Sequence, residues 1–422
     1  MPPVSDRKAI VVTYPDPFRL REARALAEVV GFQVAEVFTQ KFLSRSRHGV
    51  GSGKAAEIAT AAKEHEVDAV IFDERLKPVQ LYNLAKMAGV EVIDREKLIL
   101  EIFSRRAATT EAKLQVHLAE LRYEMARARE KVRLAKTGEQ PGFFGLGRYE
   151  VEVYRRDILK RLSNIARKLE EVSQRRDLYR RQRTRMNMPT VSLSGYTAAG
   201  KTTLFNALTG EAKETGSGAF TTLGTTTRSL LLEGTKVLLS DTVGFITDLP
   251  LYMIEAFKST LEELRHAALV LLLVDASEPP QDVGRRFMES VRTLNELQVS
   301  PSRVLVVLNK VDLSTPDHIA TTRRTLGLTS EGSVVVSART GQGLSELQGR
   351  IHSLISEQNE SRITIPASDV PRTSADIDWL RTHASVEMHP REDGGLEVRI
   401  RGPSWIIDRF RTIVSRTEDP DD

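Results

Sequence analysis

Gly195 to Thr202 reads GYTAAGKT, which matches the phosphate-binding pattern G-x-x-x-x-G-K-[ST]. The stretch lies between an apolar run, Thr190 to Leu193, and a run with helical spacing, Thr202 to Leu208. In this context successive backbone N–H groups turn toward an anion, and the following helix points its positive end at the same place. We therefore predict a phosphate-binding loop in which Lys201 reaches the β- and γ-phosphates and the Thr202 hydroxyl coordinates Mg²⁺.

A second motif, D-x-x-G, follows further along the chain. Asp241-Thr242-Val243-Gly244 comes directly after an apolar strand pattern, Lys236 to Leu239. In phosphate-sensing NTPases such an aspartate holds Mg²⁺ through water, and the glycine N–H contacts the γ-phosphate. We expect these two roles for Asp241 and Gly244.

Two later motifs select the base. Asn309-Lys310-Val311-Asp312 follows the strand pattern Arg303 to Leu308, and a carboxylate at Asp312 can accept hydrogen bonds from both N1–H and N2–H₂ of guanine. Adenine offers no such pair of donors, so the lost hydrogen bonds would exclude it. Ser337-Ala338-Arg339 follows another strand pattern, Ser333 to Val336, and its backbone could contact guanine O6.

The four motifs occur in the order and context of a Ras-like G domain, each at the end of a strand, and they resemble the translation-factor-related class of P-loop GTPases. GTP and Mg²⁺ are the expected cofactors. The residues expected from these motifs to bind them are Gly195, Tyr196, Thr197, Ala198, Ala199, Gly200, Lys201, Thr202, Thr203, Asp241, Gly244, Asn309, Lys310, Asp312, Ser337, Ala338 and Arg339.

Composition excludes several other classes of protein. The 422 residues contain no cysteine, so disulfides, thiolate metal sites and a cysteine nucleophile are excluded. The longest strongly apolar run, Ala267 to Val274, is far shorter than the roughly 20 residues that span a bilayer. The N-terminus shows no pattern of a secretory signal. We expect a cytoplasmic protein with no integral membrane segment; a peripheral membrane location is the alternative.

Residues 1–104 are expected to form an N-terminal α/β domain. Short apolar runs alternate with helical patterns, which favours mainly parallel strands. The strands are expected at Lys8 to Thr13, Gln33 to Phe38, Val67 to Phe72 and Val90 to Ile93, and the helices at Phe18 to Val30, Lys54 to His65 and Gln80 to Ala88. Gly51-Ser52-Gly53-Lys54 is interpreted as a turn and helix start, because Ala55 and His48 break the phosphate-loop pattern.

Residues 105–188 are expected to form a long antiparallel helical hairpin. Helical patterns run from Lys97 to about Lys136 and from about Val151 to Arg183, separated by the Gly- and Pro-rich Thr137 to Arg148. Phe143, Phe144 and Arg148 would lie at the loop tip. From Glu101 to Thr190 there are 22 Lys plus Arg and 12 Asp plus Glu, a net charge of 22 − 12 = +10. Such a block indicates RNA or a ribosome as partner, or else a solvated helical face.

Residues 189–358 are expected to form the G domain, and residues 359–422 a small α+β appendage. The appendage is predicted from strand patterns at Ala384 to Met388 and Leu396 to Ile400 and a helix near Ser404 to Val414. Trp379 and Trp405 are expected in its core. The fold class is thus a multidomain α/β protein.

Further motifs narrow the resemblance to the HflX family. They are Phe220-Thr221-Thr222-Leu223, Thr226-Thr227-Arg228, the extension Phe245-Ile246 after the D-x-x-G motif, and Gly51 to Lys54 with Glu57-Ile58. The resemblance implies a cytoplasmic GTPase that binds the large ribosomal subunit through the basic hairpin and the N-terminal domain. A monomer is expected. The resemblance also implies that Phe220, Thr221 and Thr222 bind nucleotide and that Thr222 is the switch ligand of Mg²⁺, with Thr221 as the rival.

The chain departs from the family pattern at two places. The hairpin loop, Pro141 to Gly147, is similar to a divergent, archaeal-type branch, and Gly224-Thr225 replaces the usual Asp-Pro of the first switch. Phe245 stands where many GTPases carry the glutamine that orients the attacking water. With Lys201, Thr222 and Gly244 as catalytic residues, we expect GTP hydrolysis that is slow alone and stimulated by ribosomes. The alternative is a nucleotide-gated RNA-binding switch with little hydrolysis of its own.

Overall fold

The computed structural model describes residues 7–136, 146–185, 188–211, 226–242, 244–246, 250–329, 331–356, 358–391 and 393–417. Contacts between residues divide the chain into two compact units. Of the described residues, the first unit holds those up to Gln174 together with 250–258, and the second holds the remainder from Arg175 onward. Each unit is described by itself.

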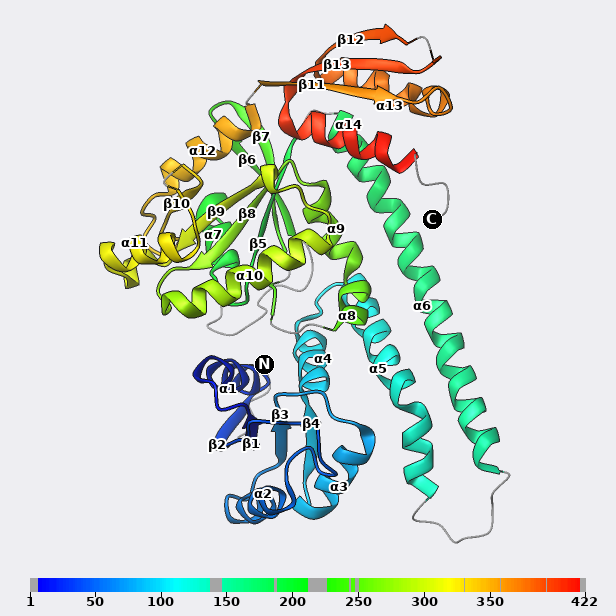
Figure 1. Cartoon of the computed structure of the whole chain (residues 1–422), viewed down its shortest axis with the longest axis vertical. Helices are drawn as coiled ribbons and strands as arrows, with labels where there is room; N and C mark the ends of the chain where they lie inside the picture. The colour runs from blue at the N-terminus through cyan, green and yellow to red at the C-terminus, as the bar shows by residue number, and fades with distance from the viewer. Residues whose placement is uncertain are drawn as a thin grey trace. The chain divides into compact units, whose positions relative to one another are not determined.

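The first unit contains a parallel four-stranded sheet (Figure 1). Its order is β2-β1-β3-β4, built from β1 (Arg7–Thr13), β2 (Phe32–Thr39), β3 (Ala69–Phe72) and β4 (Glu91–Asp94). The crossovers that parallel strands need are provided by α1 (Pro17–Val29), α2 (Ser52–Glu64) and α3 (Pro78–Ala88). The predicted alternation of strands and helices is confirmed, and α2 begins directly after Gly51, as the helix-start interpretation required.

The helical region that follows differs from the prediction. The single run expected from Lys97 is two helices, α4 (Arg95–Arg106) and α5 (Thr110–Lys136). The break occurs because Thr109 caps the second helix: its Oγ1 accepts a hydrogen bond from the backbone N–H of Ala112 at 3.1 Å. Sequence periodicity continues across such a short break and does not report it.

The second long helix, α6 (Leu146–Arg185), begins earlier than predicted and includes the end of the stretch predicted to be non-helical. Residues 137–145, with Phe143 and Phe144, lie outside the described residues. The Tyr154 hydroxyl donates to the Glu124 carboxylate at 3.5 Å, which links α6 to α5 (Figure 1). In the predicted stripe of α6, Ile158 and Ile165 are buried.

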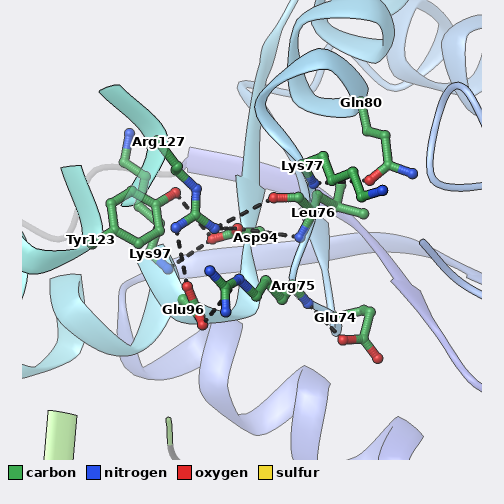
Figure 2. Close-up of polar contacts among 10 residues, drawn as sticks. All are labelled: Glu74, Arg75, Leu76, Lys77, Gln80, Asp94, Glu96, Lys97, Tyr123 and Arg127. Carbon is green, nitrogen blue, oxygen red and sulfur yellow. Dashed lines mark hydrogen bonds and ion pairs between the residues drawn. The ribbon is translucent and has the colours of Figure 1, made fainter. Parts of the chain in front are cut away.

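A buried polar cluster holds α5 against the sheet of the first unit (Figure 2). Asp94, at the end of β4, is fully buried and accepts from the Arg127 guanidinium at 2.7 Å and from the Tyr123 hydroxyl at 3.2 Å. Arg127 also donates to Glu96 at 3.1 Å. Burial and the negative charge of Asp94 raise the pKa of Tyr123, so this hydroxyl stays protonated and acts as a donor. The two elements are thus joined by a charge-assisted network.

Another helix, α8 (Leu251–Ala256), belongs to the first unit although it follows the D-x-x-G motif. The Phe257 ring packs edge-on against the ring of Phe103, with centroids 4.8 Å apart. The Arg122 guanidinium donates to the backbone oxygen of Tyr252 at 3.2 Å, and Met253 is fully buried. The sequence patterns did not predict this grouping.

The second unit contains a six-stranded sheet of order β10-β9-β8-β5-β7-β6. Its strands are β5 (Thr190–Gly195), β6 (Thr226–Leu232), β7 (Thr235–Asp241), β8 (Leu269–Asp275), β9 (Val304–Asn309) and β10 (Ser333–Val335). Only β6 runs antiparallel to its neighbour among these described strands. The associated helices are α7 (Lys201–Thr209), α9 (Lys258–His266), α10 (Pro280–Glu296), α11 (Pro316–Thr325) and α12 (Leu344–Ser356). The carboxyl ends of the parallel strands meet at one edge, where ligands of such sheets bind.

A second, smaller sheet in this unit is antiparallel. Its order is β11-β13-β12, formed by β11 (Gln358–Ile365), β12 (Ser385–Pro390) and β13 (Leu396–Pro403). Its core also contains residues of α13 (Val370–His383) and α14 (Ser404–Thr417), and Trp379 and Trp405 pack at the margin of that core. The sequence predicted β12, β13 and α14; it did not predict β11 or α13.

Among the described residues, none of the helices combines the length and apolar character needed to cross a bilayer.

Candidate nucleotide-binding site

The loop between β5 and α7 has a backbone that only glycine can form at two positions. Gly195 has φ = +136°, and a Cβ there would lie 2.3 Å from the backbone oxygen of Leu273 on β8. Gly200 has φ = +94°, and a Cβ there would lie 2.3 Å from Nδ2 of Asn309. The two motif glycines therefore allow close approach to β8 and to the base-selecting motif.

Lys201, the first residue of α7, lies inside this loop. Its Nζ donates to the backbone oxygens of Gly195 at 3.0 Å and Tyr196 at 2.9 Å, and the residue is only 8% exposed. Burial lowers the pKa of the ammonium from 10.5 to about 8, and the carboxylate of Asp241 opposes part of that shift. The loop carbonyls thus use two of the three N–H donors of the ammonium that the motif assigns to phosphates.

Thr202 and Asp241, both expected to hold Mg²⁺, lie within hydrogen-bond distance of each other. The Thr202 hydroxyl donates to Oδ2 of Asp241 at 3.1 Å, and both residues are buried. One hydroxyl and one carboxylate suit Mg²⁺, which takes few protein ligands and completes its shell with phosphate oxygens and water. Over the part of the chain that the structure describes, no cluster of three or more His, Cys, Asp or Glu could hold a metal by itself. The donor set thus fits a magnesium ion that binds together with a nucleotide.

Gly244 and Phe245 pack directly on the phosphate-binding loop. A Cβ on Gly244 would lie 2.8 Å from Nζ of Lys201 and 3.1 Å from Cα of Thr197. The backbone N–H of Phe245 donates to the Gly195 oxygen at 3.0 Å, and the Thr197 N–H donates to the Phe245 oxygen at 2.8 Å. The Phe245 side chain is 4% exposed and offers no polar group. The glycine thus lies in tight contact with the loop, and the phenylalanine is a packing residue.

Asn309 connects the phosphate-binding loop to the loop that contains Ala338, which is expected to contact the guanine base. Its Nδ2 donates to the backbone oxygen of Ala199 at 2.8 Å, and its Oδ1 accepts from the Ala338 N–H at 3.0 Å. The Ser337 hydroxyl donates to Oδ1 of Asp312 at 2.6 Å, which orients an otherwise exposed carboxylate. Three motifs far apart in sequence thus form one site at the strand ends.

Asp275, at the end of β8, belongs to this site but is absent from the sequence-based set. Its Oδ2 lies 2.6 Å from Nζ of Lys310, whose backbone is left-handed with φ = +66°. The ion pair fixes Lys310 beside Asp312. The sequence contains a signal that could have identified Asp275, because this carboxylate directly follows the apolar run that ends at Val274.

The remaining predicted residues fall into two groups. Tyr196 is buried in the loop, where the Arg286 guanidinium lies 4.8 Å from its ring centroid, whereas Ala198 and Arg339 are exposed. Thr203 is half-buried on α7. The second group, Phe220, Thr221 and Thr222, lies outside the described residues.

Comparison with known proteins agrees with this geometry. Family models described as GTP-binding GTPase N-terminal, GTP-binding GTPase Middle Region and 50S ribosome-binding GTPase match residues 18–104, 106–183 and 190–310. A GTPase HflX of Methanocaldococcus jannaschii is 46% identical over 71% of this chain and 73% of its own length. A GTPase HflX of Thermofilum pendens is 36% identical over 93% of this chain and 92% of its own length. The chain is a GTP-binding GTP hydrolase and belongs to the HflX family of GTPases.

Proposed function

We propose that this GTP hydrolase binds the large ribosomal subunit and couples GTP binding and hydrolysis to ribosome association or dissociation. The observation that carries the proposal is the set of exposed cations along α6, namely Arg156, Lys160, Arg161, Arg167 and Lys168. They lie in the stretch with a net charge of +10, and RNA backbones bind such helices through phosphate contacts. The description of the family model over residues 190–310 supports the same partner.

We place the catalytic groups on the phosphate side of the site. Lys201 would donate to the β- and γ-phosphates from its position beside the loop carbonyls, while the Gly244 N–H would contact the γ-phosphate. Thr202, Asp241 and Thr222, with Thr221 as the rival, would hold Mg²⁺. When bound, that ion neutralises charge on the transferred phosphoryl group. Preorganised donors of this kind stabilise the transition state without reorganisation.

The base side would recognise guanine. Asp312 would accept from the guanine N1–H and N2–H₂, and the backbone of residues 337–339 would contact O6. Lys310 would lie against the base in the position fixed by Asp275. A site of this chemistry rejects adenine because Asp312 and the backbone of residues 337–339 would lose their hydrogen-bond partners.

Phe245 makes slow turnover the expected basal state, because its side chain cannot orient a water molecule. The bound large subunit would supply that positioning by ordering the switch segments. The alternative, an RNA-binding switch with little hydrolysis, rests on the same residue. Measured phosphate release with and without subunits separates the two.

We further propose that the chain acts as a cytoplasmic monomer with four parts, at residues 1–104, 105–188, 189–358 and 359–422. The first two would form the ribosome-binding surface. The third would hold GTP.

Co-sedimentation with purified large subunits tests the proposal. We expect the protein to pellet with a non-hydrolysable GTP analogue and much less with GDP. The variant R156Q/K160Q/K168Q should bind more weakly and show a salt slope smaller by about 2 to 3, since about 0.7 to 0.9 is lost per phosphate contact. The matched variant K236Q/R324Q, which neutralises an exposed lysine on β7 and an exposed arginine on α11, should leave the slope unchanged. Equal pelleting in all nucleotide states would contradict the proposal.

A further inference from the structure

The loop between β2 and α2, residues 40–51, combines cations with an exposed aromatic ring. Its sequence, QKFLSRSRHGVG, contains Lys41, Arg45 and Arg47 and no acidic residue. All three cationic side chains are exposed, and the Phe42 ring is 48% exposed. This loop, called the β2–α2 loop below, has no part in the nucleotide site.

Side chains of α3 hold the backbone of the β2–α2 loop in place. Nε2 of Gln80 donates to the backbone oxygens of Ser44 at 2.8 Å and Ser46 at 2.6 Å. Nδ2 of Asn83 donates to the backbone oxygen of Arg47 at 3.1 Å. The cationic residues are therefore displayed by a fixed backbone.

Buried apolar side chains also hold the same loop in place. Leu43 and Val50 are 3% and 0% exposed and anchor its two arms. Ser44 has φ = +63°, an unfavourable backbone conformation for serine, and Gly49 has φ = +79°. A Cβ on Gly49 would lie 2.9 Å from Cδ2 of Leu76. Local strain of this kind persists only where surrounding contacts enforce it, and it concentrates at functional sites.

The ring of Phe42 lies among the cations. The Arg45 guanidinium carbon is 4.4 Å from the ring centroid, and Nζ of Lys41 is 5.6 Å from it. Nε2 of Gln40 donates to the Phe42 backbone oxygen at 2.9 Å, which fixes the start of the turn. A flat apolar face and a guanidinium plane are thus presented together, and unpaired bases stack on both.

We propose that the β2–α2 loop binds an unpaired segment of RNA, with a base stacked on Phe42 and Arg45 and phosphates held by Lys41 and Arg47. The inference rests on the proposed function, since the large subunit is the RNA-containing partner, and it names a binding site in the N-terminal part of the chain. RNA fits better than an acidic peptide, because carboxylates would use the cations but leave the aromatic face without a partner. Double-stranded RNA would use the cations but offers no free base face.

The test is fluorescence anisotropy of the full chain with a labelled 12-nucleotide oligoadenylate and with a 12-base-pair RNA duplex. F42A should weaken oligoadenylate binding by about 5- to 100-fold, the range for loss of one stacked base, and leave duplex binding unchanged. F42W should retain binding. K41Q/R47Q should reduce the salt slope for oligoadenylate by about 1.4.

Two substitutions outside the loop serve as controls. Tyr82 is also exposed, but it lies two residues after Gln80, on a different face of α3 from the side chains that hold the loop. Y82A and K63Q should bind oligoadenylate like the unchanged protein. F42A binding as tightly as the unchanged protein, or losing oligoadenylate and duplex equally, would overturn the inference.

Co-sedimentation of the same variants with large subunits separates this inference from the proposed function. If the unchanged protein and F42A both pellet with subunits and bind oligoadenylate equally, the loop proposal fails and ribosome association stands. If the unchanged protein does not pellet with subunits but F42A still loses oligoadenylate binding, ribosome association fails and the RNA site stands.

Discussion

At the scale of single residues, the phosphate-binding loop holds the Lys201 ammonium where phosphates would bind. Lys201 donates to two loop carbonyls, and the Thr197 N–H is bonded to Phe245. Phosphate oxygens would accept from the third N–H of the ammonium. The Lys201 ammonium, poorly solvated without nucleotide, would then gain anionic partners, which raises its pKa.

The rise in the pKa of Lys201 predicts proton uptake on GTP binding. With a pKa of about 8 in the nucleotide-free protein, Lys201 is about one tenth neutral at pH 7 and about half neutral at pH 8. Calorimetry of Mg²⁺·GTP binding in buffers of different ionisation enthalpy should therefore show uptake that rises from about 0.1 to about 0.5 proton between these pH values.

The lowered pKa of Lys201 also determines how the free energy of unfolding depends on pH. The pKa of 10.5 in the unfolded chain exceeds the folded value, so the unfolded state binds more protons between about pH 8 and pH 10.5. The free energy of unfolding of the nucleotide-free protein therefore rises with pH through that window because of Lys201.

The calorimetric measurement also has an outcome that would contradict the shifted pKa. If proton uptake on GTP binding stayed constant between pH 7 and pH 8, Lys201 would be charged before GTP binds.

At the scale of elements, a buried cluster of charged and polar side chains links α5 to the sheet. Arg127 is 3% exposed and bridges Asp94 of β4 and Glu96 of α4, and its guanidinium carbon lies 3.6 Å from the Tyr123 ring centroid. A buried ion pair of this kind adds little net stability over a well-packed apolar pair, but removal of one partner leaves the other as an uncompensated buried charge. The helix therefore depends on all members of the cluster.

We predict that Arg127→Met destabilises α5 within the full chain by about 3 to 5 kcal/mol. Hydrogen–deuterium exchange of amides in residues 110–127 should accelerate at least about 100-fold, because exchange follows local opening. The matched control is Arg24→Met on α1, which removes an exposed pair with Glu28 worth at most about 1 kcal/mol. Similar exchange in the two variants would contradict the role given to the cluster.

At the scale of the whole molecule, sequence patterns predicted the elements with strong periodicity and the motifs with fixed spacing. The loops after β5, β7 and β9 meet as expected because parallel strands end at one edge of a sheet. The patterns missed contacts decided by tertiary packing: the Asp275–Lys310 pair, the break before α5 at Thr109, and the grouping of α8 with the first unit. None of these has a local period or a motif of its own.

The most direct test of the central claim is the rate of phosphate release from GTP as purified large subunits are added to the unchanged protein. Because Phe245 cannot orient water, we expect slow release without subunits and a saturable rise with them, absent from Lys201→Ala. A rate that is already high without subunits and does not change on their addition would contradict it.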